Sequence, residues 1–487
     1  MIRFIESVLF SFRKCFTRNG CFKWFVIIVT ALMLRGDKLG VTSFIRDLDL
    51  SHKCYENLLH FFHSGSYLLS SLRAQWYRIV LKKAPIYKVE GRSILIGDGV
   101  KQSKEALRMP GVKKMVQESE TSSKPEYIHG HLFGVIGIII SGWNSKFCLP
   151  LKSNIQDGLN AMASWPESKG IVDISDKSHV EQIVEAGFEV AKVIGKSFLV
   201  LDRYFLSRSA LELQDRQNRS LGTSDEQSVV IVTKAKANCT AYRHPRRKAG
   251  KKGRPPKKGK SVKLISLFTQ KRFFKEATVK LYGNEESVSY YCLNLLWGQG
   301  LYRELRFVLV KYHGKYSILV STDTTLDPLT IIGLYGTRFS IEENFREFKQ
   351  QIGGFSYHFW TSSMPKLNHF AKKGTDPLES LIDTHNREKV LDTVKAIETF
   401  VFCSSIAMGI LQMLALDKNH KEEIKAARYL RTASKDTPSE ATVMYYFRKR
   451  LFHILARNSE SFVTQFIREK QLWGLPDEND SPEKEIA

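Results

Sequence analysis

The chain has 487 residues, of which 43% are hydrophobic and 11% aromatic, and this composition is that of a globular protein rather than a disordered one. This length is enough for two to four domains. The formal net charge of +24 indicates a polyanionic partner, either nucleic acid or an anionic membrane surface.

The membrane alternative is disfavoured by the longest apolar run at the N-terminal end, WFVIIVTALML over residues 24–34. This run is far shorter than the roughly 20 residues that span a bilayer, and it lacks a small-residue cleavage site. It predicts a buried core helix. The seven cysteines contain no CxxC pair, which fits a reducing cytosol and argues against a disulfide framework or a structural zinc site. We therefore expect a cytoplasmic protein without a membrane partner.

Residues 1–88 have helical periodicity and form the first predicted region. Within it, segments 42–48 and 51–63 read as two helices joined by a short turn, with Ser51 as the N-cap of the second. A helix-turn-helix would place the second helix in a DNA groove and bind DNA ends. Two ordinary packed helices are the alternative.

Residues 89–225 predict an α/β unit. Apolar runs and periodicity indicate three strands, a helix and a fourth strand, in the order 92–97, 131–140, 147–151, 178–195 and 196–205. The first run is followed at once by Asp98, and the last strand ends in Asp202. We therefore expect both aspartates at the carboxyl ends of strands.

Residues 226–324 contain short β-rich segments at close spacing, which predict an antiparallel sheet inserted into the α/β unit. Within this segment, RHPRRKAGKKGRPPKKGK (243–260) has ten Lys or Arg residues and no acid. Its Gly-Arg-Pro core resembles an AT-hook, in which an extended arginine lies in a narrow minor groove. Candidate DNA contacts are Arg246, Arg247 and Arg254. The alternative is a solvated loop.

Residues 325–388 continue the α/β unit and contain YGTRFSIEENFREFK, numbered 335–349. On a helix, one side is apolar: Leu334, Ile341, Phe345, Phe348 and Ile352. A neighbouring stripe is polar: Tyr335, Arg338, Glu342 and Lys349. Ser340 and Glu343 match a capping box, which predicts that the helix restarts at residue 340. The ordinary explanation for the polar stripe is a solvated face with an Arg338–Glu342 pair.

The C-terminal part predicts a helical region over 389–475, with a long, mostly buried helix at 390–416. An acidic tail at 476–487 follows, and its composition predicts disorder.

Three acids stand out by context: Asp98, Asp202 and Glu342. A carboxylate at the end of an apolar strand is costly to bury without a compensating charge, and a surface loop position is the plain alternative for each one. Three hard oxygen ligands gathered at one sheet edge can hold Mg²⁺ or Mn²⁺. Two such ions, on the order of 3.5 to 4 Å apart, stabilise both oxygens of a phosphoryl displacement.

The polar stripe matches the pattern Y-(2)-R-(3)-E-(6)-K at Tyr335, Arg338, Glu342 and Lys349. This pattern resembles the signature of bacterial insertion-sequence DDE transposases, whose RNase H-like domain carries a β-strand insertion before the glutamate. The resemblance covers roughly residues 90–365. It implies an RNase H-like catalytic core with an inserted antiparallel β-rich subdomain and helical N- and C-terminal regions.

By this resemblance, the three acids would bind two Mg²⁺ ions, for which Mn²⁺ can substitute, and carry DNA strand cleavage and strand transfer. The Tyr, Arg and Lys of the pattern would contact the DNA backbone. The partners would be double-stranded element ends and target DNA, bound by a homodimer. The rival hypotheses are an RNase H-like endonuclease without strand transfer and a non-catalytic DNA-binding protein derived from a transposase.

Four aromatic or imidazole positions remain open in the sequence. Family members often stack a flipped base on an aromatic side chain, and Tyr357 or Trp360 could serve, although core packing is the alternative for either. His129 and His131 could be metal ligands, but strand packing or a DNA contact is favoured because no third soft ligand lies nearby in the sequence.

Overall fold

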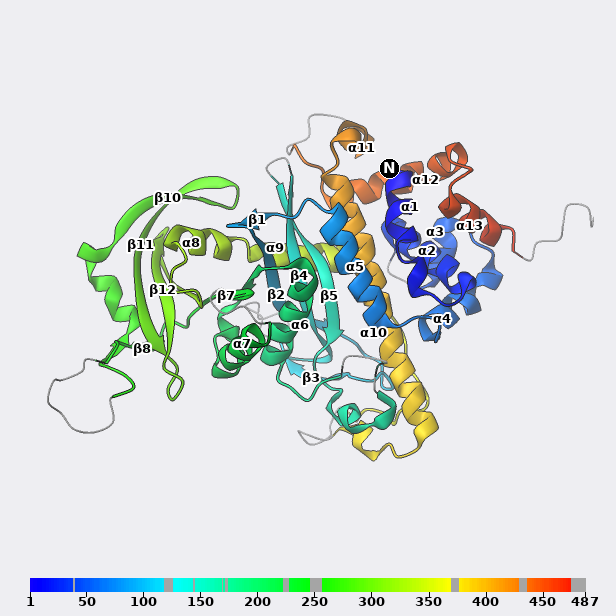
Figure 1. Cartoon of the computed structure of the whole chain (residues 1–487). Coiled ribbons are helices and arrows are strands. Elements are labelled where there is room, and N and C mark those ends of the chain that lie inside the picture. Colours follow the sequence, from blue (N-terminus) through cyan, green and yellow to red (C-terminus); the bar gives the residue numbers. More distant parts are fainter. Residues whose placement is uncertain are drawn as a thin grey trace, which may run out of the picture.

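The computed structural model describes residues 1–37, 40–117, 126–142, 145–168, 170, 174–221, 227–245, 256–368, 376–428 and 436–473. Within these ranges the protein is a mixed α/β structure with thirteen α-helices and one large mixed sheet (Figure 1). The predicted α/β class is therefore confirmed.

Five strands form the central part of the sheet, in the order β5-β4-β2-β6-β7. Their bounds are Arg92–Ser103 (β2), Tyr127–Gly142 (β4), Ser145–Ile155 (β5), Ser197–Leu201 (β6) and Val229–Lys234 (β7). The first three pair antiparallel, whereas β6 runs parallel to β2 and β7 runs parallel to β6. The short strands β1 (Lys88–Val89) and β3 (Lys113–Val116) pair with β2 and β4.

Two helices make the crossover connections of the parallel strands: α6 (His179–Ile194) precedes β6, and α7 (Arg208–Ser220) joins β6 to β7. A capping box between Ser178 and Glu181 starts α6, and Gly195 ends it with a φ of 97°. The predicted order of three strands, a helix and a strand is thus present in the structure.

The β-rich segment continues the same sheet, because β13 (Lys315–Ser321) pairs antiparallel with β7. The other strands of the segment are β8 (Thr240–Tyr242), β9 (Ser261–Lys263), β10 (Lys275–Leu281), β11 (Asn284–Trp297) and β12 (Arg303–Tyr312). They lie to the left of the central strands in Figure 1. The predicted insertion begins at residue 226 and would include β7. In the structure β7 pairs with β6 and belongs to the central strands, so the β-rich branch of the sheet begins only after β7.

Helices of the two terminal regions pack together on the other side of the molecule (Figure 1). The N-terminal helices are α1 (Ile2–Phe10), α2 (Asn19–Leu34), α3 (Thr42–Leu48), α4 (Tyr55–His63) and α5 (Leu69–Lys83). The C-terminal helices are α10 (Thr384–Ala415), α11 (Lys421–Arg428), α12 (Glu440–Arg457) and α13 (Phe462–Gln471). The boundary predicted at 389 therefore falls inside α10.

Helix α10 is the central helix of this bundle, and it contacts β5, α2 and α4. It is the one described helix that is long and apolar enough to cross a bilayer, whereas α2, which contains residues 24–34, is too short. Its apolar window is completely buried, as in the core helix of a soluble protein. The segment 24–34 lies in α2 and is buried, as predicted.

The two predicted helices of the N-terminal region are present as α3 and α4. The Ser51 hydroxyl accepts the backbone N–H of Lys53 at the start of a short 3₁₀ turn that leads into α4. Phe44, Phe61 and Phe62 are buried between these helices and α10. A role of this pair in DNA binding stays a prediction.

Candidate active site

Asp98 lies within β2 rather than at its end, which corrects the sequence expectation. The strand continues to Ser103 because the antiparallel ladder with β4 extends that far. The parallel ladder between β2 and β6, however, has its last pair at Gly97 and Leu201. Asp98 and Asp202 each follow this pair by one residue, so they lie side by side where the parallel ladder ends.

Close packing of α6 explains the glycines on both sides of Asp98. A Cβ atom at Gly97 would come within 2.8 Å of the Ile183 side chain, and one at Gly99 would come within 2.8 Å of the His179 ring. Both of these neighbours belong to α6. The Gly-Asp-Gly sequence thus lets α6 approach β2 directly beside the acid.

The stretch 335–349 forms two helices and not one. Helix α8 (Pro328–Gly336) ends before Arg338, α9 (Phe339–Glu347) follows, and a π-helical turn (Phe348–Ile352) carries Lys349. The predicted restart is therefore confirmed to within one residue, but α9 has no side-chain cap, so the capping box of Ser340 is not formed. Gly353, with a φ of 62°, ends the π turn.

The predicted apolar stripe anchors this element to the sheet. Leu334, Ile341, Phe348 and Ile352 are buried, and Phe345 is partly buried. The buried Asn344 amide donates to the Cys148 carbonyl of β5 at 2.8 Å, which fixes α9 against the sheet. The polar stripe is thereby placed beside Asp98.

Arg338 joins two of the three candidate acids. Its Nη1 lies 3.2 Å from Asp98 Oδ2, and its Nη2 makes a short contact with Glu342 Oε1. The pair expected on a solvated face is therefore present, but it is only part of a bridge that also reaches β2. The Arg338 side chain is only 17% exposed.

The electrostatics bring the third acid into the same site. Burial raises the pKa of Asp98 to about 6, and the Asp202 and Glu342 charges act in the same direction, whereas Arg338 and the Gly99 N–H oppose the shift. Burial also raises the pKa of Tyr335, which lies beside Arg338 and Asp202. Asp98, Asp202 and Glu342 therefore act on one another through space.

The pKa of Arg338 shows how strongly this site favours a positive charge. Burial lowers this pKa, but Asp98, Glu342, Tyr335 and Asp202 together outweigh that effect, and the pKa is raised. A cation at this place is thus stabilised by all of the surrounding acidic groups.

Three basic residues lie near the candidate acids: Lys349, Lys234 and Arg203. The last two were not among the residues singled out from the sequence. Lys349 Nζ donates to the Lys101 carbonyl of β2 at 3.0 Å. Lys234 ends β7, and its pKa is lowered by burial and by Arg203, while Asp202 opposes the shift. Lys234 stands at the end of a parallel strand as Asp202 does, and this position is the signal that could have identified it.

The donor set suits a hard divalent ion, because it consists of three carboxylates. As the side chains lie, no three His, Cys, Asp or Glu residues in the described ranges are gathered closely enough to share an ion. The guanidinium of Arg338 supplies the positive charge between Asp98 and Glu342.

The open aromatic and histidine positions are resolved in part. Tyr357 is 1% exposed and its hydroxyl is 2.6 Å from His131 Nδ1, while His131 Nε2 is 2.9 Å from the Pro110 carbonyl. Both residues therefore belong to the core. Trp360 is 63% exposed. The basic candidates Arg246, Arg247 and Arg254, and the tail 476–487, lie outside the described residues.

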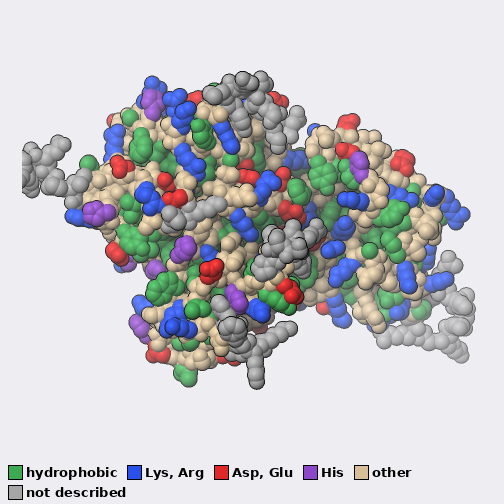
Figure 2. Space-filling model, turned by 180° about the vertical axis from the view of Figure 1, so that it is seen from behind, with side chains coloured by type: hydrophobic (Ala, Val, Ile, Leu, Met, Phe, Trp, Pro, Cys, Tyr) green, Lys and Arg blue, Asp and Glu red, His purple; other side chains and the backbone are tan. Residues whose placement is uncertain are grey.

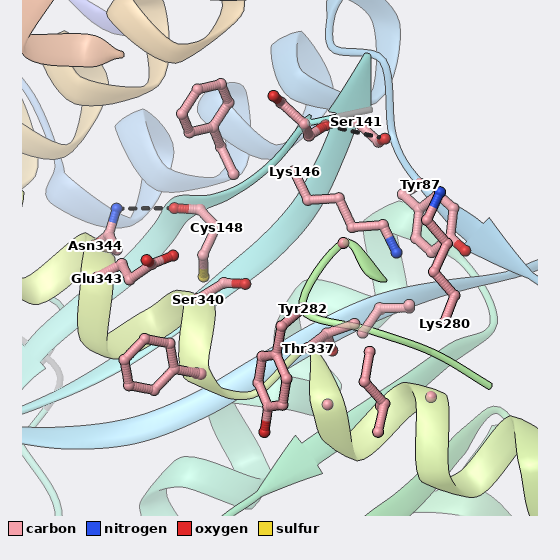
Figure 3. A pocket seen from close by; sticks show the side chains of 18 of the residues that line it. Tyr87, Ser141, Lys146, Cys148, Lys280, Tyr282, Thr337, Ser340, Glu343 and Asn344 are labelled. Atoms are coloured by element: carbon pink, nitrogen blue, oxygen red, sulfur yellow. Dashed lines mark hydrogen bonds between the residues drawn. The ribbon is translucent and has the colours of Figure 1, made fainter. Parts of the chain in front are cut away.

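A groove of about 930 Å³ lies on the other side of α8 and α9 (Figure 3). Thr337, Ser340, Glu343 and Asn344 line it, together with Lys146 and Cys148 of β5 and with Lys280 and Tyr282 at the β10–β11 turn. Tyr335, Arg338 and Glu342 do not line it. The two helices thus separate this groove from the acids.

Seen from behind, Lys and Arg side chains are spread over both the body and the β-rich insertion (Figure 2). This distribution agrees with the net charge and marks no single patch on this face. Comparisons with models of known protein families, with curated proteins and with solved structures found no match for the chain.

Proposed function

We propose that this chain is a DNA transposase that binds the ends of its insertion element and carries out cut-and-paste transposition. The observation that carries the proposal is the bridge from Arg338 to Asp98 and Glu342, next to Asp202 at the end of the parallel ladder. Asp98 belongs to β2, Asp202 follows β6 and Glu342 belongs to α9, so successive acids lie 104 and 140 positions apart in the sequence.

The proposal includes an RNase H-like catalytic core. The strand order β5-β4-β2-β6-β7, with three antiparallel strands followed by two parallel ones, supports it. Asp98 on β2, the first strand of this core in chain order, lies beside Asp202 at the end of β6, its fourth strand. This placement also agrees with such a core, as does the β-rich branch that precedes α9 with Glu342.

Asp98, Asp202 and Glu342 would hold two Mg²⁺ ions, which supply Lewis-acid stabilisation of the attacking and leaving oxygens when bound. The protein side chains would position the substrate. Arg338 can form a two-pronged contact with a phosphate, and Lys349 adds a point charge next to β2. Tyr335, half-buried beside Arg338, would contact the same backbone.

The partners that follow from this proposal are double-stranded element ends and target DNA, bound by a homodimer in the bacterial cytoplasm. The net charge of +24 supports a nucleic-acid partner. Arg246, Arg247 and Arg254 of the basic run would add contacts that do not depend on the DNA sequence.

The test uses a supercoiled plasmid that carries the inverted repeats flanking this gene. Mg²⁺-dependent end cleavage and strand transfer are expected, and Asp98→Asn, Asp202→Asn or Glu342→Gln should abolish both while DNA binding is retained. Cleavage without joining would favour the endonuclease, and binding without cleavage in Mg²⁺ or Mn²⁺ would favour a non-catalytic protein. Cleavage by Glu342→Gln would contradict the site assignment.

A further inference from the structure

Arg338 is held by the same carboxylate oxygens that a divalent ion would use. Asp98 Oδ2 and Glu342 Oε1 both accept hydrogen bonds from its guanidinium. Arg338 is the more buried member of its pair with Glu342, with 17% of its side chain exposed against 43%. The guanidinium is therefore covered more than the Glu342 carboxylate and about as much as that of Asp98, which is 21% exposed.

A guanidinium and a divalent ion cannot both occupy this place. Each needs the lone pairs of the same two oxygens, and two positive centres a few ångströms apart repel each other. A hard ion binds carboxylate oxygens directly, whereas arginine binds them through hydrogen bonds that form equally well with a phosphate. When metal binds, the guanidinium can therefore pair with a phosphate instead, and the two carboxylate oxygens are left to the metal.

The backbone around Arg338 suits an exchange of partners. Arg338 stands at the break between α8 and α9, after the last residue of one helix and before the first of the next. The long arginine side chain can change direction by rotation about its own bonds, without a movement of the backbone. Glu342 lies one turn further along, within α9.

We propose that Arg338 is a built-in counter-ion that a divalent ion displaces from Asp98 and Glu342, and that this displacement frees the guanidinium to bind a DNA phosphate. The inference rests on the proposed function and adds to it an order of events: the phosphate contact of Arg338 forms only when metal is bound. Without metal, the same residue neutralises the acids and competes with metal binding.

The first experiment measures the Mn²⁺ affinity of the full chain without DNA, by the loss of the free Mn²⁺ signal in electron paramagnetic resonance. Arg338→Gln should bind Mn²⁺ on the order of tenfold more tightly than the unchanged protein, within the usual range of coupling between two sites. Arg338→Lys, which keeps the charge but cannot form the two-pronged contact, should fall between the two.

Arg346→Gln is the matched control, because Arg346 also belongs to α9 but contacts Glu347 at 3.1 Å. It removes the same charge and should leave the Mn²⁺ affinity unchanged within about twofold. Equal tightening in both Gln variants would overturn the proposal, since net charge alone would then explain the effect. An unchanged or weaker Mn²⁺ affinity of Arg338→Gln would overturn it as well.

The second experiment counts phosphate contacts from the salt dependence of binding to a fluorescent non-specific duplex, in EDTA and in Ca²⁺. Each phosphate contact contributes about 0.9 to the slope of log K against log salt. Arg338→Gln should match the unchanged protein in EDTA and have a slope lower by about one contact in Ca²⁺. Lys349→Gln should lower the slope in both conditions. If Arg338→Gln lowered the slope equally in EDTA and in Ca²⁺, the exchange of partners would be contradicted.

These measurements separate the inference from the proposed function. If the protein binds Mn²⁺ and Asp202→Asn abolishes that binding, but Arg338→Gln has no effect, only the exchange is wrong. If neither the unchanged protein nor any variant binds Mn²⁺, the metal-dependent function and the exchange are both wrong.

Discussion

At the scale of single residues, the candidate site gathers buried negative charge at a cost in stability. Asp98 is largely buried beside two other acids, and one arginine compensates for only part of this negative charge. Its pKa of about 6 means that ionised Asp98 is disfavoured in the folded protein compared with the unfolded chain. Such local cost is common where catalytic groups are gathered.

Asp98→Asn is therefore expected to stabilise the metal-free protein at neutral pH. Because the pKa is raised on folding, the unfolded chain binds fewer protons, and the folded protein loses stability as the pH rises from the ordinary range of an aspartate to about 6. The variant should gain about 2 to 3 kcal/mol at about pH 8 and almost nothing at about pH 4. Urea unfolding in EDTA at both pH values measures this gain.

Asp436→Asn serves as the control for this prediction, because Asp436 is exposed. It should change the free energy of unfolding by less than about 0.5 kcal/mol at either pH. A gain for Asp98→Asn that does not depend on pH would show that the burial of the charge is not its cause.

At the scale of elements, the helix pair α8 and α9 is fixed by contacts with other parts of the chain. Asn344 fastens α9 to β5, and the buried Arg35 donates to the Ile352 and Gly353 carbonyls at the end of the π turn, at 3.3 and 3.1 Å. Arg35 follows α2, so the N-terminal helices support the end of the element that carries Lys349. A π turn between α9 and this anchor is typical of functional sites.

Arg35→Met should destabilise the protein by about 3 kcal/mol, because it leaves two buried carbonyls without their donor. The apparent free energy of unfolding in urea measures the loss. Arg3→Met, at an exposed position of α1, should cost less than about 0.5 kcal/mol. If the two substitutions had equal effects, the contact between Arg35 and the π turn would not contribute to stability.

At the scale of the whole molecule, one continuous sheet joins the central strands to the β-rich segment, and the basic run 243–260 lies within that segment. The described ends of the run pair with each other, since the Arg243 N–H donates to the Lys260 carbonyl at 2.9 Å. The described ends of the run adjoin β8 and β9, at the far side of the sheet from the terminal helices (Figure 1).

Deletion of residues 243–260 should weaken binding to DNA of any sequence and flatten the dependence of log K on log salt, because it removes ten of the positive charges. Titration of a labelled non-specific duplex at several salt concentrations measures the slope. An unchanged slope would mean that the run does not touch DNA.

Much of the local structure could be predicted because it depends on neighbours in the chain. Periodicity located β4, β5, α6, β6 and α10, and the spacing of Tyr335, Arg338, Glu342 and Lys349 identified the candidate helix. Asp202 was placed correctly because β6 ends where its apolar residues end. The likeness to transposases comes from this same local pattern and stays a proposal.

The remaining features depend on contacts between residues that are distant in the chain, and no local pattern encodes them. Asp98 lies inside β2 because β4 continues to pair with it, and β7 belongs to the central strands because β6 is its partner. Lys234 comes under the influence of the Asp202 charge, and Arg338 bridges Asp98 to Glu342, only after the sheet has formed. Spacing thus identified the charged residues, whereas strand pairing and helix packing determined which of them meet.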